Sequence, residues 1–221
     1  MHIEKIGRRE IQLNALIRQL NPDVIVFSGD FLNLSYRTDP AAIQAARQVI
    51  AQWAAPLGVY AVTGSTAVDY PEVISQILAD LPVKWLKNET TTLPYAGGQV
   101  NLIGITCSHR PHQDAPLLAG LLHNLNGLNI LLYHTPDLAP EAARLGVDLQ
   151  LSGHTHGGQV RLPFFGALIT RSLYGKRFEA GRYQLQQMVL YVSRGLGLEG
   201  AGAPRVRFLC PPELILWEIS A

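Results

Sequence analysis

Short apolar runs alternate with amphipathic stretches along most of the chain. An apolar stripe at helical spacing, as in Leu13, Leu16, Ile17 and Leu20, predicts a helix, whereas a short continuous apolar run such as V-I-V-F-S predicts a buried strand. The expected helices cover residues 3–20, 41–53, 71–81, 117–122 and 138–145. The expected strands cover residues 24–28, 58–63, 129–133, 148–152, 183–193 and 213–219. This alternation predicts an α/β fold with a largely parallel sheet.

The stretch 83–105 departs from that order. It contains two β-rich runs joined by Ala96-Gly97-Gly98, which predicts an antiparallel hairpin.

Composition narrows the class of protein. The 221 residues are 48% hydrophobic and 16% charged, which predicts one globular domain over residues 1–221. A net charge of +1 gives no electrostatic case for nucleic-acid binding. Two cysteines exclude a disulfide-stapled scaffold. We find no apolar run of membrane-spanning length and no signal-peptide pattern, so we expect a cytoplasmic protein.

Charge is less even towards the C-terminus. Residues 161–221 carry eight Lys and Arg against four Asp and Glu. This balance suits an anionic substrate or a lipid headgroup, and it equally suits a solvated face.

Polar residues follow four of the predicted strands directly. Asp30, Ser65, His134 and His154 each stand at or just beyond the end of an apolar run. Because the carboxyl ends of parallel strands meet at one edge of a sheet, we expect these four side chains to converge there.

The type of these residues points to a metal. Asp30 with His134, His154 and His156 forms a nitrogen and oxygen donor set, which suits Mn²⁺, Fe²⁺, Zn²⁺ or Co²⁺ better than Ca²⁺. In G-H-T-H-G-G an extended backbone would keep both histidines on one side, and a turn would spread them to two adjacent ions. Taken singly, Gly29-Asp30 also fits a plain turn and His134 a structural histidine.

Two other segments carry polar residues without a clear role. We interpret His109 and His112 as part of a solvated loop. The glycine-rich stretch 193–202 lacks the Lys-Ser/Thr pair of a phosphate-binding P-loop, and a loop on the substrate side is the interpretation left open.

These motifs resemble the calcineurin-like metallophosphoesterase superfamily, and within it the bacterial YkuE- and YaeI-like branch. The resemblance is carried by N-P-D-V-I-V-F-S-G-D at 21–30, I-L-L-Y-H-T-P-D at 130–137 and L-S-G-H-T-H-G-G-Q-V-R-L-P at 151–163. It covers nearly the whole chain, and S-R-G-L-G at 193–197 with P-P-E at 211–213 also matches the branch.

The resemblance implies a four-layer α/β/β/α sandwich with two divalent metal ions at the strand ends. Asp30 would bridge the ions, His134 and His154 would bind the second ion, and His156 the first. The implied reaction is hydrolysis of a phosphoester by attack of metal-bound hydroxide.

Two positions differ from the family pattern. The family begins with a strand ending in Asp-x-His, and here Met1-His2 matches only its end, so His2 falls at the motif's histidine. Our hypothesis is that this chain lacks that strand, as a truncated frame or through a wrongly chosen Met. The family's Gly-Asn-His is Gly64-Ser65-Thr66 here. Ser65 would replace a metal-binding Asn, and Thr66 a histidine that assists the leaving group. Asp69 would compensate as a ligand or cap a turn.

The sequence therefore predicts a metal-dependent phosphoester hydrolase, a phosphodiesterase or pyrophosphohydrolase acting on small or lipid-linked substrates. Peripheral membrane contact through residues 161–221 is a hypothesis, and we expect the full-length form to be membrane-associated. The alternative is a non-catalytic relative in which the histidines hold one structural ion. A dinucleotide-binding protein ranks lower, because the first strand-to-helix turn lacks G-x-G-x-x-G.

Overall fold

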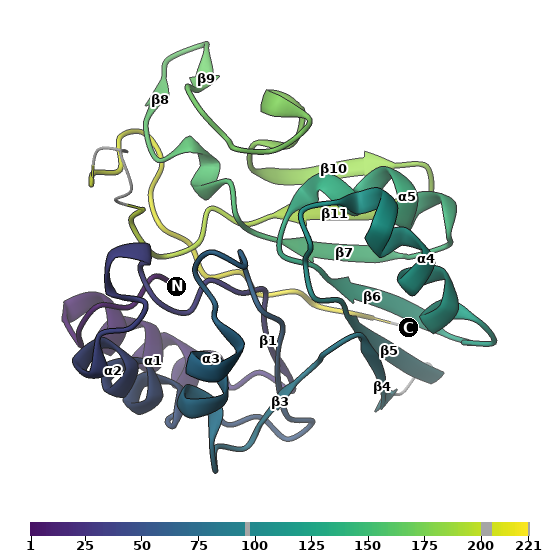
Figure 1. Cartoon of the computed structure of the whole chain (residues 1–221). Helices are drawn as coiled ribbons and strands as arrows, with labels where there is room; N and C mark the ends of the chain where they lie inside the picture. Colours follow the sequence, from purple (N-terminus) through teal and green to yellow (C-terminus); the bar gives the residue numbers. More distant parts are fainter. Residues whose placement is uncertain (96–97, 200–204, 221) are drawn as a thin grey trace.

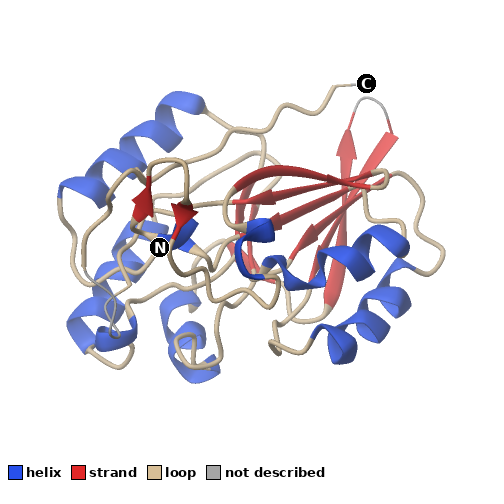
Figure 2. Cartoon of the chain, turned by 90° about the horizontal axis from the view of Figure 1, so that it is seen from above, coloured by secondary structure: helices blue, strands red, loops and turns tan. Residues whose placement is uncertain are grey.

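Two β-sheets face each other, and a layer of helices covers the outer side of each sheet (Figures 1 and 2). The computed structural model describes residues 1–95, 98–199 and 205–220. The layers follow the order helix, sheet, sheet, helix, which confirms the predicted α/β/β/α sandwich.

The first sheet has three parallel strands in the order β1-β2-β3. The strands are β1 (Ile25–Phe27), β2 (Val59–Ala61) and β3 (Val83–Trp85). The helices of this half are α1 (Arg8–Leu20), α2 (Pro40–Ile50) and α3 (Pro71–Leu78). Pro stands at the first position of both α2 and α3, where its missing N–H leaves no backbone hydrogen bond unmade.

The second sheet is mixed and has the order β10-β11-β7-β6-β5-β4. Its strands are β4 (Glu89–Tyr95), β5 (Gly98–Gly104), β6 (Leu128–Leu132), β7 (Leu149–Ser152), β10 (Gly181–Leu185) and β11 (Met188–Val192). Helices α4 (Pro111–Leu122) and α5 (Ala139–Arg144) belong to this half. Two short antiparallel strands, β8 (Arg161–Leu162) and β9 (Gly166–Ala167), form a separate hairpin. Single 3₁₀ turns cover Leu34–Tyr36, Pro136–Leu138, His156–Gly158 and Gly175–Phe178.

Strand residues alternate between two cores. Val59 and Ala61 pack with the first helix layer, whereas Tyr60 between them joins the core between the sheets. Leu131 likewise packs with the second helix layer, and its neighbour Leu132 joins the inner core. Because successive side chains leave a strand on opposite faces, a strand that is apolar throughout must be covered on both sides. The four-layer arrangement provides that cover.

Several predicted boundaries need correction. The first helix begins at Arg8 rather than at residue 3. The predicted strand 183–193 is part of the hairpin β10-β11, because Gln186 adopts a positive φ between them. Residues 213–219 form no assigned strand. The predicted antiparallel hairpin of 83–105 is confirmed as β4-β5, although residues 96 and 97 of its turn lie outside the described residues.

No helix within the described ranges is both long enough and apolar enough to span a bilayer.

Candidate metal centre

The site lies where strands of both sheets end. Strand β1 leads into Asp30, β2 into Ser65, β6 into His134 and β7 into His154. The backbone N–H of Ser65 donates to Asp30 Oδ1 at 2.9 Å, which joins the ends of β1 and β2. Ser65 Oγ lies 3.3 Å from His134 Nε2, so the two sheets meet at this point. The predicted convergence of the four strand ends is therefore present in the structure.

Two glycines allow this close approach. Gly29 has a φ of +99°, and a Cβ there would overlap the backbone of Gly64. A Cβ on Gly64 would in turn overlap the Asp30 carboxylate. Because no side chain fits at either position, the loops after β1 and β2 can touch only with glycine at both.

Asp30, His134 and His154 form the first of two candidate ligand groups. Asp30 Oδ2 lies 3.3 Å from His134 Nε2, and His134 Nε2 lies 3.2 Å from His154 Nδ1. One donor atom from each residue falls within 4.8 Å of the other two. Ser65 Oγ is 3.4 Å from His154 Nδ1 and so borders the same group.

The second group shares Asp30 with the first. It adds His2 and His156, whose Nε2 atoms lie 3.0 Å apart. His2 Nε2 is 3.3 Å from Asp30 Oδ2. Asp30 is thus the residue common to both groups.

Backbone carbonyls fix the orientation of two of these rings. His134 Nδ1 lies 2.8 Å from the Ser28 carbonyl, and His154 Nε2 lies 3.3 Å from that of Arg171. A hydrogen on each of these nitrogens would leave His134 Nε2 and His154 Nδ1 free as ligands. This pattern of a ring nitrogen held by a carbonyl is common for metal-binding histidines. The donor chemistry of the described residues therefore fits a divalent transition metal.

The ionisation of the group also favours a cation. Burial acts to raise the pKa of Asp30, but His134 and His2 hold that pKa well below its usual range, so the carboxylate is charged. Burial and then the charge of His134 lower the pKa of His154 to about 3. Burial and then His2 lower the pKa of His156 well below its usual range. The two imidazoles are thus neutral near pH 7, as metal ligation requires.

Asp69 is a support rather than a ligand of the group. Its Oδ2 accepts hydrogen bonds from the N–H groups of Asp30 at 2.8 Å and Gly64 at 2.6 Å. Its Oδ1 accepts from the N–H of Phe31 at 2.9 Å. The buried carboxylate therefore ties the loop after β1 to the loop after β2, and through the Asp30 backbone it fixes the bridging position.

His109 belongs to the site, which corrects its interpretation as part of a solvated loop. Its ring centroid lies 5.3 Å from that of His154 and 6.4 Å from that of His134. Its side chain is partly buried, whereas His112 is exposed. Strand β5 runs parallel to β6, so the segment after β5 emerges at the same edge as His134. Residues that follow neighbouring parallel strands lie at the same edge of a sheet, so the pairing of β5 with β6 would have been the signal that predicts His109 as a site residue.

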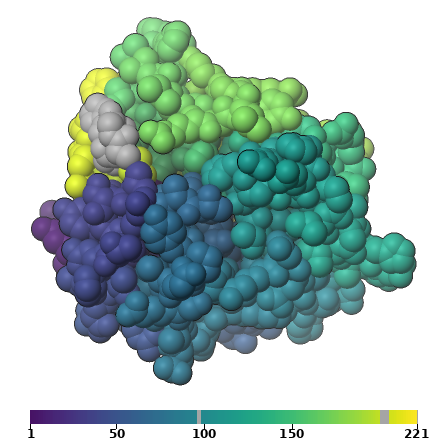
Figure 3. Space-filling model, in the orientation of Figure 1, coloured from purple at the N-terminus to yellow at the C-terminus, as the bar shows by residue number. Residues whose placement is uncertain are grey.

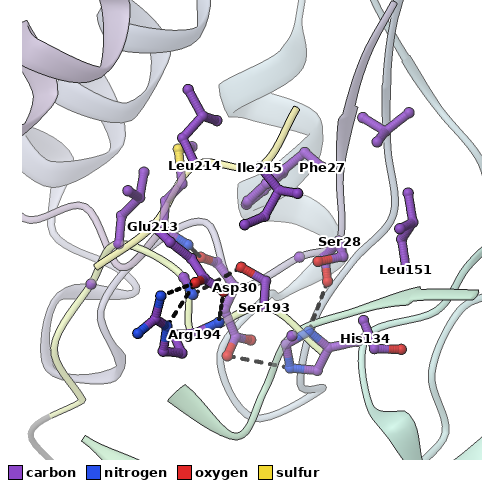
Figure 4. A pocket seen from close by; sticks show the side chains of 18 of the residues that line it. Phe27, Ser28, Asp30, His134, Leu151, Ser193, Arg194, Glu213, Leu214 and Ile215 are labelled. Carbon is purple, nitrogen blue, oxygen red and sulfur yellow. Dashed lines mark hydrogen bonds and ion pairs between the residues drawn. The ribbon is translucent and has the colours of Figure 1, made fainter. Parts of the chain in front are cut away.

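Two cavities border the ligand groups. The wider one has a volume of about 600 Å³ and is lined by Asp30, His154 and His156 together with Thr66, His109 and Arg171. The narrower one, of about 190 Å³, reaches Asp30 and His134 past apolar side chains such as Phe27, Leu151 and Ile215 (Figure 4). Figure 4 also shows the Arg194 guanidinium paired with Glu213 beside this cavity. The wider cavity thus sets polar side chains of the ligand groups beside apolar ones such as Val68, Leu168 and Ile169.

Comparisons with known proteins agree with this arrangement. The model of the calcineurin-like phosphoesterase family matches residues 6–158. The uncharacterized metallophosphoesterase YkuE of Bacillus subtilis is 33% identical over 213 residues, which are 93% of this chain and 70% of that protein.

A second relative and a solved structure extend the comparison. The UDP-2,3-diacylglucosamine pyrophosphatase LpxG of Chlamydia trachomatis is 32% identical over 71% of this chain and 47% of its own length. The NAD nucleotidase NadN of Haemophilus influenzae shares the fold, with a TM-score of 0.57 at 15% identity over 83% of this chain and 43% of that chain. This chain thus spans less than half the length of either protein.

Proposed function

The chain belongs to the calcineurin-like phosphoesterase family, and we propose on that basis that it hydrolyses a phosphoester at the group centred on Asp30. Family membership supports a phosphoester hydrolase, and the family generally uses divalent metals. The observation that carries the proposal is that two candidate ligand groups share the Asp30 carboxylate.

In this proposal Asp30 would be shared by two ions. His134 and His154 would hold one ion, with Ser65 Oγ as a neutral neighbour, and His2 and His156 would hold the other. The nitrogen and oxygen donors suit Mn²⁺, Fe²⁺, Zn²⁺ or Co²⁺. When bound, such ions supply Lewis acidity that stabilises phosphoryl charge and activates water.

We assign the contact with the substrate phosphoryl group to His109. Thr66, which stands where the resemblance implied a histidine, lines the same cavity as His109. A ring N–H on His109 can donate to a phosphoryl or leaving-group oxygen; the Thr66 hydroxyl can also donate, but it stands on a shorter side chain and is no imidazole. His109, in the loop after β5, would then supply the imidazole that the loop after β2 lacks at Thr66.

The proposed substrate is a phosphodiester or a pyrophosphate, small or lipid-linked. The wider cavity combines the polar ligand groups with the apolar side chains of Val68, Leu168 and Ile169. A ligand with a charged and an apolar part fits such a lining. The name of the relative LpxG likewise joins a pyrophosphate to a diacylated sugar. A lipid-linked substrate would bring the protein into peripheral contact with a membrane through residues 161–221.

Hydrolysis of bis-p-nitrophenyl phosphate with and without Mn²⁺ tests the proposal. We expect Mn²⁺-dependent hydrolysis that falls by about 10²-fold or more in the His154→Ala variant. The exposed His112 provides a matched control, and His112→Ala should hydrolyse at the rate of the unaltered protein. Equal rates in all three proteins, or no dependence on Mn²⁺, would support the non-catalytic alternative instead.

A further inference from the structure

The hairpin β8-β9 carries an unusual exposed apolar surface. Leu162, Phe164 and Phe165 are 44%, 110% and 57% exposed, and Leu168, Ile169 and Leu173 after the hairpin are 49%, 70% and 69% exposed. Figure 1 shows β8 and β9 projecting beyond the sheets, and in Figure 3 the same green segment stands out from the body of the molecule. We call residues 161–177 the aromatic flap. Large apolar side chains gathered at one projecting site mark an interaction surface.

The flap is also basic. The flap and the five residues that follow it, 161–182, contain five Arg and Lys against one Glu, and that residue, Glu179, is paired with Arg161 at 2.6 Å. Lys176 lies against the tip itself, with its Nζ 3.5 Å from the centroid of the Phe165 ring. An aromatic tip flanked by cations is the composition of segments that enter the interface of an anionic bilayer.

The remaining basic residues of the C-terminal quarter are engaged elsewhere. Arg194 pairs with Glu213, and Arg205 pairs with Glu4. Arg207 donates to backbone carbonyls, including that of Gly197 at 2.7 Å. The positive charge of residues 161–221 is therefore concentrated towards solvent on and beside the aromatic flap.

The flap continues into the wall of the wider cavity. Leu168, Ile169 and Arg171 line that cavity, and the Arg171 carbonyl lies 3.3 Å from His154 Nε2. The exposed apolar surface of the flap therefore adjoins the candidate metal centre, because residues 168–171 belong both to the flap and to the wall of the cavity.

We propose that the aromatic flap is a membrane-docking element that inserts Phe164 and Phe165 into the interface of an anionic phospholipid bilayer. Docking would bring the mouth of the wider cavity to the level of the headgroups, where a lipid-linked phosphoester could enter. Only this last link rests on the proposed function, because insertion itself needs neither metal nor hydrolysis.

Flotation with vesicles tests the proposal. The chain is mixed in EDTA and low salt with vesicles of phosphatidylcholine alone or with a third of phosphatidylglycerol. We expect flotation with the anionic vesicles, and about tenfold weaker partitioning for Phe164→Gln, because a phenyl group leaves the apolar phase. Ile11→Gln is the matched control, since Ile11 is 61% exposed on α1, and it should float like the unaltered protein.

Other outcomes would overturn the proposal. Absence of flotation with anionic vesicles would do so, and so would equal flotation of the Phe164→Gln and Ile11→Gln variants. A dimer that Phe164→Gln dissociates in analytical ultracentrifugation, without vesicle binding, would assign the flap to a second copy of the chain. Flotation by a protein that hydrolyses no phosphoester would sustain the docking surface and reject the proposed function alone.

Discussion

The facing ring nitrogens of His134 and His154 lie 3.2 Å apart, and the opposite nitrogen of each ring lies beside a backbone carbonyl. If those outer nitrogens carry the hydrogens, two lone pairs face each other across this gap. Such an arrangement requires a positive charge between the rings. Burial acts to lower the pKa of His134 but Asp30 raises it above its usual value, so a proton can supply this charge without metal. A divalent ion would supply it in the loaded protein.

Removal of the His109 imidazole should impair turnover more than folding. We expect His109→Ala to lower kcat by about 10²-fold and to weaken competitive inhibition by inorganic phosphate, because the proposed N–H contact with the phosphoryl oxygens is lost. His109→Gln retains an N–H donor and should recover part of the loss. The exposed His112 is the control, and unchanged kinetics in both the His109→Ala and His112→Ala variants would remove His109 from the site.

Exchange of Asp69 for asparagine should loosen the bridging position. The Asp69 carboxylate accepts hydrogen bonds from three backbone N–H groups. In the Asp69→Asn variant the side-chain NH₂ would face at least one of these donors. The lost hydrogen bond should lower the unfolding free energy by about 1–3 kcal/mol. Because Asp30 would shift with its backbone, metal affinity should fall by about 10–100-fold. Urea unfolding and metal titration measure the two effects.

Asp39→Asn is the matched control for that change. Asp39 caps α2 by accepting from the N–H of Ala41 at 2.8 Å, and asparagine caps a helix equally well. Its stability and metal affinity should match those of the unaltered protein. An Asp69→Asn variant that behaves like Asp39→Asn would show that the buried carboxylate does not position Asp30.

Acid should destabilise the metal-free protein through His154. The pKa of His154 is about 3 in the folded state, because of burial and the charge of His134, and about 6.5 in an unfolded chain. The unfolded state therefore binds more protons between these values, and stability falls as the pH drops from about 6.5 towards 3.

Urea unfolding in EDTA at pH 7, 6 and 5 checks this dependence. The slope of unfolding free energy against pH should be smaller in His154→Gln by up to about 1.4 kcal/mol per pH unit, the value for one proton. Parallel curves for the two proteins would contradict the assignment.

The ends of the parallel strands were the most predictable part of this protein. Asp30, Ser65, His134 and His154 each follow a buried apolar run directly. Each is therefore expected at the carboxyl edge of a sheet, even though these residues are far apart in the sequence. The same reasoning did not predict His109 as a site residue. The sequence predicts β5 only as part of an antiparallel hairpin with β4, and its parallel pairing with β6 is seen only in the structure.

Short or unpaired segments were harder to predict. Strands β8 and β9 have two residues each, too few for any periodicity. Residues 213–219 have strand-like composition but belong to no assigned strand, although the Glu213 N–H donates to the Gly195 carbonyl at 3.2 Å, and composition alone cannot supply a strand partner. The apolar residues of the flap follow the G-H-T-H-G-G motif in sequence, but only the structure shows that they are exposed together and that Leu168 and Ile169 among them line the cavity.

The metal content of the folded protein tests the central claim most directly. After expression with added Mn²⁺ and exhaustive dialysis, plasma mass spectrometry should find about two transition-metal ions per chain, one for each ligand group that shares Asp30. The His154→Ala variant should retain about one ion. A single ion in the unaltered protein would contradict the two-ion site, and a folded chain without bound metal would contradict the metal centre itself.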